Sequence, residues 1–323
     1  MNDTQKRFPY DVLHIGKQKC ASTYIQYYGL KCHPEIKLIW REHINIFYRF
    51  IEYNFNYEIE DYFYELNEIM QDTQNKNNKI TVFSNENFCG FAFTGNNARL
   101  IADLTYKTFG NIKCFIIVRE PFSYIYSVWD QYVHEGGTLH LGDFLNKKYS
   151  PTWSPYFKQF SKSRLWFHAL NMPLINYWKK LYGDDYFAVF LLEDLKSNPK
   201  KFFYSLYNFL GVDTNYTPPN KKANSSYSYP LTGIKRKLNR FYCTQHNPSG
   251  FLSFDRHFEL RRKFDKINKN KKYKILLSKI INDAKKPDPR SFASKEIIDM
   301  IKSDNYELAK LLDRDVSSLG YEI

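Results

Sequence analysis

The chain has 323 residues, and its content of 43% hydrophobic and 18% aromatic residues is enough to build a core, which excludes a disordered polypeptide. Its 47 Lys and Arg residues outnumber its 34 Asp and Glu residues, so the net charge is +13. Residues 221–290 alone hold 19 basic and 5 acidic residues, and the rest of the chain is nearly neutral. Because the excess is confined to one segment, we expect no nucleic-acid coat protein.

Several other protein classes are disfavoured by the sequence. No apolar run is long enough to cross a bilayer, and the first twelve residues lack the apolar stretch of a secretory signal. The five cysteines are scattered without a Cys-x-x-Cys pair, which indicates neither a disulfide framework nor a zinc site. We therefore expect a cytoplasmic protein that needs no metal.

Apolar runs alternate with helical patterns along the chain, which predicts an α/β fold with a parallel central sheet flanked by helices. Strands are predicted over residues 10–15, 79–83, 113–118 and 187–192. Helices are predicted over residues 22–30, 96–108, 121–133, 164–182, 199–210 and 295–312.

The organisation predicted for the whole chain is a single domain, residues 1–323. Residues 1–230 form its α/β nucleotide-binding core, and residues 231–323 form a basic, mostly helical C-terminal extension. We expect this extension to pack on the core rather than to form an independent domain.

The stretch from residue 10 to residue 30 predicts an anion site. A strand is followed by the short loop GKQKCA and then by a helix, and backbone N–H groups at such a helix start attract anions. Lys19 adds a positive charge, and Ser22 and Thr23 add hydroxyl donors. The spacing differs from the Walker A loop, since no second Gly precedes the Lys. By itself, the loop is equally consistent with a surface lysine before an ordinary helix.

HIGKQKCASTYIQ resembles the 5′-phosphosulfate loop of sulfotransferases that use 3′-phosphoadenosine 5′-phosphosulfate (PAPS), particularly bacterial and carbohydrate sulfotransferases. The resemblance implies a P-loop-like, three-layer fold. Cys20 and Ala21 stand where Ala or Ser and Gly are commoner in the family. The loop residues implied to bind the nucleotide are Lys19, Cys20, Ala21, Ser22, Thr23 and Tyr24.

A second part of the same family pattern lies at the end of the third predicted strand. There an Arg and a Ser eight residues later bind the 3′-phosphate, and Arg119 and Ser127 have this separation here. Arginine offers a planar fork of donors that suits phosphate. The loop NKKANSS resembles a Lys/Arg-x-Asn-x-Ser segment near the nucleotide, which implies the same role for Lys222 and Asn224.

The segment from Tyr177 to Asp213 and the ending NYELAKLLDRDVSSLGY also resemble parts of this family. Within the first, Glu193-Asp194-Leu195 match its Glu-Asp-Leu core. We interpret these three residues as structural, at a strand end and a helix entry.

Sulfuryl transfer needs a base for the acceptor hydroxyl and positive charge beside the leaving group. Lys19 is the predicted leaving-group stabiliser. Glu86 follows the second predicted strand, resembles a Ser-x-Glu of bacterial members and is the predicted base; a solvated loop carboxylate is the alternative. His134 and His140 compete for the same role, whereas His14, inside a strand, is interpreted as structural.

The acceptor site is less defined by the sequence. WREHINIF resembles a glycan sulfotransferase segment, which makes Arg41 and His43 candidate acceptor-binding residues, with His134 and His140 as further candidates. The alternative is that the first two belong to a helix surface.

The function predicted is a PAPS-dependent sulfotransferase that acts on a hydroxyl of an acceptor, expected to be a carbohydrate, and releases 3′-phosphoadenosine 5′-phosphate. A kinase with a P-loop-like fold, or a non-enzymatic binder of anions or nucleic acid, is the alternative. The basic segment 221–290 carries more charge than one PAPS requires. We interpret it as a solvated face or as a patch for an acidic glycan or an anionic membrane surface.

Overall fold

The computed structural model describes residues 11–40, 80–91, 93–146, 165–219, 229–270 and 286–323. The chain forms two compact units, and neither is continuous in sequence. The first unit comprises Met1–Glu120, Leu170–Ala223 and Lys302–Ile323, and the second comprises Pro121–Ala169 and Asn224–Ile301. The expectation that the C-terminal extension packs on the core stays a prediction.

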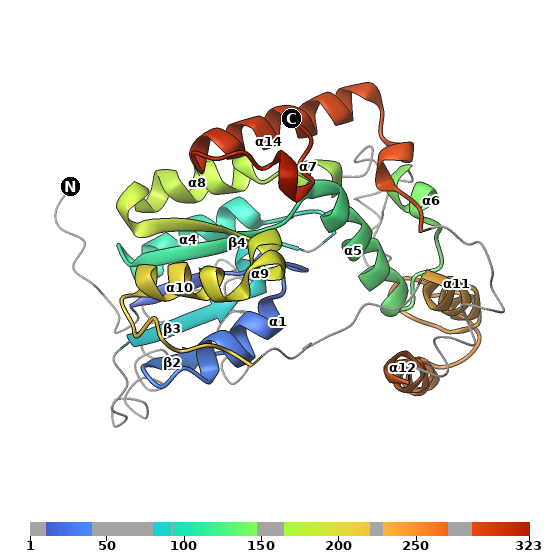
Figure 1. Cartoon of the computed structure of the whole chain (residues 1–323). Helices are drawn as coiled ribbons and strands as arrows, with labels where there is room; N and C mark the ends of the chain where they lie inside the picture. Colours follow the sequence, from blue (N-terminus) through green and yellow to red (C-terminus); the bar gives the residue numbers. More distant parts are fainter. Residues whose placement is uncertain (1–10, 41–79, 92, 147–164, 220–228, 271–285) are drawn as a thin grey trace. The chain divides into compact units, whose positions relative to one another are not determined.

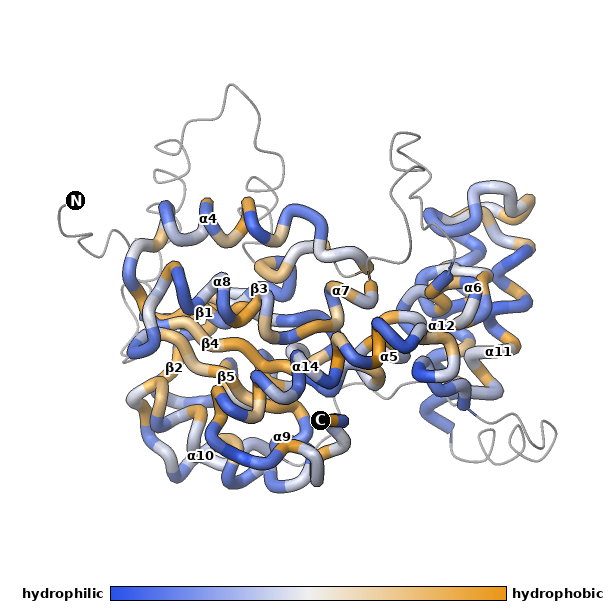
Figure 2. The backbone as a smooth tube through the Cα atoms, turned by 90° about the horizontal axis from the view of Figure 1, so that it is seen from above, coloured by the Kyte–Doolittle hydropathy of each residue, from blue (hydrophilic) through white to orange (hydrophobic). Residues whose placement is uncertain are grey.

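A parallel sheet of five strands forms the centre of the first unit (Figure 1), in the order β2-β3-β1-β4-β5. The strands carry mostly hydrophobic residues (Figure 2), as expected for a sheet covered on both faces. The prediction of an α/β fold with a parallel central sheet is confirmed. The strands are β1 (Val12–Ile15), β2 (Ile36–Ile39), β3 (Ile80–Asn85), β4 (Lys113–Val118) and β5 (Phe187–Leu191).

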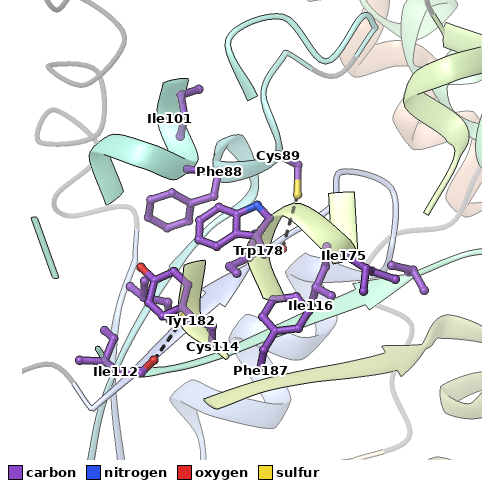
Figure 3. Packing of buried hydrophobic residues seen from close by; sticks show 14 of the residues in the cluster. Phe88, Cys89, Ile101, Ile112, Cys114, Ile116, Ile175, Trp178, Tyr182 and Phe187 are labelled. Carbon is purple, nitrogen blue, oxygen red and sulfur yellow. Dashed lines mark hydrogen bonds between the residues drawn. The ribbon is translucent and has the colours of Figure 1, made fainter. Parts of the chain in front are cut away.

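Helices cover both faces of this sheet, which makes three layers (Figure 1). On one face, α4 and α8 pack with the last part of α14, and Figure 3 shows Trp178 and Phe88 in contact within this core. On the other face, α10 packs on β5 through Phe202 and Phe190. The helices are α1 (Ser22–Tyr24), its continuation η1 (Ile25–Lys31, a π-helix), α4 (Ala98–Phe109), α8 (Met172–Tyr182), α9 (Leu192–Ser197), α10 (Pro199–Leu210) and α14 (Lys295–Leu311).

Two predictions of secondary structure were wrong. The strand β2 was missed, because four residues with half-buried Lys37 inside them do not stand out from a loop. The single helix expected over residues 164–182 is interrupted at Leu170 and Asn171. Pro173 lies in the first turn of the helix that follows, where proline is tolerated, whereas inside a continuous helix it would break a hydrogen bond.

The second unit is helical within its described residues. Its α5 begins at Pro121, directly after the end of the first unit's chain segment, as the sequence predicted. Asn239 joins two parts of this unit, since its side-chain amide donates to the carbonyls of Val133 and Gly137. The helices are α5 (Pro121–His134), α6 (Leu141–Asn146), α7 (Leu165–Ala169), α11 (Tyr229–Leu238) and α12 (Phe254–Lys269).

Candidate active site

The loop between β1 and α1 has a backbone suited to binding an anion. Lys19 and Ala21 have φ angles of 63° and 62°, in the left-handed region. Residues of this conformation, alternating with ordinary ones, turn successive backbone N–H groups toward one point. Ala21 is also the N-cap of α1, and no side chain caps the helix there. The first-turn N–H groups therefore lack the side-chain acceptor that Ser, Thr, Asp or Asn supplies at this position.

Arg119 lies beside this loop. One Nη of its guanidinium donates a hydrogen bond of 3.1 Å to the carbonyl oxygen of Lys19. The two residues follow β4 and β1, which are neighbours in the sheet, and both are half-buried. The guanidinium of Arg119 and the backbone of Lys19 are thus brought together at the carboxyl ends of adjacent parallel strands, where ligands of such folds bind.

Glu86 follows β3, on the other side of β1, and packs directly against the start of the loop. A Cβ built on Gly16 would lie 3.0 Å from the Cα of Glu86 and 3.2 Å from its Cγ. Glycine at this position therefore permits the close approach. The side chain of Asn85 holds the turn by accepting a hydrogen bond from the N–H of Asn87. Glu86 is half-buried at the same sheet edge as Lys19 and Arg119.

Lys17 lies in the loop between β1 and α1 and anchors this loop to the core. It was not among the site residues predicted from the sequence. It is fully buried, and its ammonium donates to the carbonyl of Leu170 at 3.2 Å and to Oδ1 of Asn171 at 2.9 Å. The amide of Asn171 in turn donates to the carbonyl of Arg119 at 3.2 Å. The buried side chain of Asn171 therefore connects Lys17 in the loop to Arg119 at the end of β4.

The C-terminal helix takes part in the same network through Asp304. Its carboxylate accepts hydrogen bonds from the backbone N–H groups of Asn171 and Met172 at 2.8 and 2.9 Å. It thus caps the start of α8, and a carboxylate is favoured at a helix N-terminus. Burial lowers the pKa of Lys17 and raises that of Asp304, while the attraction between the two opposes both shifts.

The pKa of the Cys20 thiol is affected by four charged side chains near it. Burial raises its pKa to about 12, so the thiol stays protonated and is no nucleophile. Lys17 and Arg119 act on it in the opposite direction, while Glu193 and Glu86 add to the increase. Lys17, Arg119, Glu86 and Glu193 therefore all lie close enough to Cys20 for their charges to act on its thiol.

The other predicted loop residues have definite places. Ser22 is buried, and its hydroxyl donates to the carbonyl of Lys17 at 3.4 Å, which tightens the loop. Thr23 is half-buried at the start of α1. The hydroxyl of Tyr24 donates to the carbonyl of Pro219 at 3.1 Å.

The structural interpretation of the Glu-Asp-Leu segment is confirmed. Glu193 accepts hydrogen bonds from the backbone of Glu120 and from the hydroxyl of Tyr321. Asp194 binds the guanidinium of Arg314 at 2.8 and 2.9 Å. Both carboxylates thus hold the C-terminal segment onto the first unit.

His14 is also structural, as predicted. It is fully buried, stacks on Phe115 with ring centroids 4.5 Å apart, and its Nδ1 lies 2.7 Å from the hydroxyl of Ser84. Burial lowers the pKa of His14 to about 3. A fully buried histidine whose pKa is this low is a weak proton acceptor, so we do not assign His14 as the base.

Three predicted residues belong to the second unit. Ser127 is buried on α5. His134 accepts a hydrogen bond of 3.0 Å from Lys235 at its backbone carbonyl, and its ring lies 3.4 Å from the same ammonium. His140 is exposed, and its pKa is lowered by the partial loss of water around its ring and by the positive charge of Arg236.

Four predicted residues, Arg41, His43, Lys222 and Asn224, lie outside the described residues. Within the part of the chain that is described, no group of three or more His, Cys, Asp or Glu side chains could hold a metal ion. Among the same residues, no helix is long and apolar enough to cross a membrane.

No family model and no curated protein matches the sequence. Among solved structures, a sulfotransferase from Alicyclobacillus acidocaldarius matches with a TM-score of 0.49 and 17% identity, over 67% of this chain and 86% of that chain. The chain is similar in structure to sulfotransferases. A sulfotransferase domain from the curacin biosynthetic pathway matches with a TM-score of 0.47 and 13% identity, over 96% of this chain and 99% of that chain. The likeness concerns the general fold alone.

Proposed function

We propose that the protein is a PAPS-dependent sulfotransferase whose active site lies at the carboxyl ends of β1, β3 and β4. The hydrogen bond between Arg119 and the Lys19 carbonyl carries this proposal, because it unites two cationic residues that sequence reasoning assigned to one nucleotide from separate segments. Glu86, packed against Gly16, adds a carboxylate at the same edge. Two phosphate-binding elements and one candidate base are the minimum that sulfuryl transfer requires.

The loop fits a doubly charged phosphate group. Its two left-handed residues and the uncapped start of α1 offer backbone N–H donors, and Lys19 supplies charge. PAPS, when bound, supplies an activated sulfuryl group on its 5′-phosphate. The loop and Lys19 would hold that end, and Arg119 would hold the 3′-phosphate.

Each chain residue then has a defined task. Glu86 accepts the proton of the acceptor hydroxyl as its oxygen forms the new bond to sulfur, and the bond between sulfur and the phosphate oxygen breaks. Lys19 stabilises the negative charge that develops on that leaving oxygen. Lys17 and Asn171 touch neither partner, and they hold Lys19 and Arg119 in position from the core.

For the acceptor, we propose a carbohydrate hydroxyl. The support is the resemblance of the segment around Arg41 and His43 to glycan sulfotransferases. A screen of glycan acceptors with labelled PAPS, followed by mapping of the labelled position, tests this part separately from nucleotide binding.

Calorimetric titration with 3′-phosphoadenosine 5′-phosphate tests the nucleotide site. We expect binding that Arg119→Ala weakens about tenfold to a hundredfold, since a hydrogen bond to a charged group contributes about 1.5–3 kcal/mol. Arg99→Ala is the matched control, because Arg99 is exposed in the same unit, where it stacks on Tyr177. Preference for ATP with Mg²⁺ would instead favour a kinase, and binding of nucleic acid alone would favour a non-enzymatic binder.

A further inference from the structure

Four phenylalanines of the second unit are exposed together. Phe241, Phe251, Phe254 and Phe258 have relative exposures of 46, 77, 47 and 42%, and we call them the phenylalanine patch. Single exposed apolar residues are ordinary on protein surfaces, whereas a contiguous group indicates an interaction surface.

The backbone holds the two halves of the patch together. The N–H of Leu252 donates to the carbonyl of Phe241 at 2.9 Å, and the N–H of Cys243 donates to the carbonyl of Leu252 at 2.7 Å. Phe241 and Phe251 therefore lie side by side, with ring centroids 5.8 Å apart. α12 begins at Phe254, just after this bridge.

The second half of the patch lies on the first turns of α12. The rings of Phe254 and Phe258 meet edge to face, with centroids 4.8 Å apart. Both are in ring contact with His257, which is buried beneath them and also meets Tyr242 beside the bridge. Two of the four rings thus contact one buried histidine, and that histidine also meets Tyr242, the chain neighbour of Phe241, which links the two halves of the patch.

Positive charge continues from the patch along α12. Phe254, Phe258, Arg262 and Lys266 are spaced four residues apart and so are neighbours along the same side of the helix. All four are exposed. Over residues 229–270 the exposed charged residues are seven cations, Lys237, Arg240, Arg256, Arg262, Lys263, Lys266 and Lys269, and two anions, Asp255 and Glu259.

We propose that the phenylalanine patch and the cations of α12 dock the protein on an anionic lipid surface. A helix with aromatic residues on one part of its surface and Lys and Arg beside them is typical of interfacial binding, in which the rings enter the headgroup region and the cations meet anionic lipids. The phenyl ring lacks any polar group, so four exposed phenylalanines suit the lipid boundary better than the hydroxyls of a glycan. The proposal rests on the second unit alone and is independent of the sulfotransferase assignment.

Vesicle co-sedimentation of the full chain tests the proposal. We expect binding to vesicles of phosphatidylcholine mixed with phosphatidylglycerol at low salt, little binding to phosphatidylcholine alone, and release at high salt. The double variant Phe251→Ser with Phe254→Ser should lower the partition coefficient at least about tenfold, because two rings lose their burial in the interface. Phe167→Ser is the matched control, since Phe167 is 61% exposed on α7 outside the patch, and it should bind as the wild type does.

A second pair of substitutions keeps the test decisive if the phenylalanine variant folds poorly. Arg262→Glu with Lys266→Glu changes only exposed side chains and should also abolish binding to the anionic vesicles. The proposal is overturned if the wild type does not bind these vesicles at low salt, or if either double variant binds as tightly as the Phe167→Ser control. It is equally overturned if a soluble acidic polysaccharide, rather than lipid, binds in a manner that depends on Phe251 and Phe254.

Discussion

The guanidinium of Arg119 donates a hydrogen bond to the backbone carbonyl of Lys19 across a separation of 100 residues in the chain. This bond fixes one cation beside the loop that carries the other. Residues that are already in place lose little freedom when an anion arrives, so less of the binding energy is used to order them. The relationship therefore supports the proposal that the two residues bind the phosphates of the nucleotide.

Replacing Lys19 by alanine should lower turnover about a hundredfold to a thousandfold, the usual cost of removing one group that stabilises developing charge. The fold should persist, because the side chain is only half-buried and the loop keeps its backbone hydrogen bond from Arg119. Steady-state sulfuryl transfer from PAPS measures the loss. Lys31→Ala removes an exposed lysine of η1 and should leave turnover unchanged. Equal turnover in both variants would remove Lys19 from the mechanism.

Glu86→Gln should abolish transfer while leaving the affinity for 3′-phosphoadenosine 5′-phosphate nearly unaltered. Glutamine keeps the shape packed against Gly16 but cannot accept a proton, and loss of a general base costs about 10² to 10⁴ in rate. Paired transfer assays and calorimetric titrations separate the two effects, with Glu307→Gln as an exposed control. An active Glu86→Gln enzyme would shift attention to His134 or His140.

The three charged residues predicted for the catalytic and nucleotide-binding roles in the first unit, Lys19, Glu86 and Arg119, share one property: each directly follows a strand or lies in the loop after one. Lys19, Glu86 and Arg119 stand at the carboxyl ends of β1, β3 and β4, and the pairing of parallel strands alone brings these ends together. A local pattern that predicts the strands therefore also predicts that such residues meet.

The buried residues that hold the site in place, Lys17, Asn171 and Asp304, show no comparable local pattern in the sequence. Asn171 lies 154 residues from Lys17 and 133 residues from Asp304 along the chain, and only the packing of α8 and α14 makes them partners. The sequence alone does not distinguish a buried lysine such as Lys17 from a lysine on the surface. Pro173 was the one available signal, because a proline there indicates a new helix start, and the first N–H groups of a helix, here from Asn171 on, need acceptors outside the helix.

Asn171→Ala should weaken nucleotide binding although Asn171 touches no ligand in the proposed mechanism. The substitution leaves the ammonium of Lys17 and the carbonyl of Arg119 each without one hydrogen-bond partner inside the protein, which should cost about 3 kcal/mol of stability. Loosening of Arg119 and Lys19 should raise the dissociation constant for 3′-phosphoadenosine 5′-phosphate about tenfold.

Asn239→Ala is the matched control for this positioning role. Asn239 is equally buried and its side chain likewise makes two hydrogen bonds, both donated to backbone carbonyls, but it does so in the second unit. Urea denaturation should show a comparable loss of stability for both variants, while calorimetry should show a change of affinity for Asn171→Ala alone. Equal affinity in the two variants would reduce Asn171 to a purely structural residue.

Ala21→Gly should raise stability, because alanine at a φ of 62° carries a steric cost that glycine avoids. The greater freedom of glycine in the unfolded chain offsets part of the gain, which leaves roughly 0.5–1 kcal/mol. Asn97→Gly is the comparison, since Asn97 has the same φ of 62° but asparagine tolerates this conformation better. Urea midpoints compare the two, and a destabilised Ala21→Gly protein would contradict the argument.

Stability should decline in acid because of His14. The pKa of His14 is lowered by burial from 6.5 to about 3 in the folded protein. Between these values the unfolded chain binds a proton that the folded chain does not, so stability falls as the pH falls through this range. The stability that depends on neutral His14 is complete above about pH 6.5, and at about pH 4.5 it has fallen by about 2–3 kcal/mol.

His14→Asn keeps a polar atom for Ser84 but does not titrate. Its urea-unfolding free energy should therefore drop less than that of the wild type between about pH 7.5 and about pH 4.5, and equal drops would exclude His14 as a source of acid sensitivity.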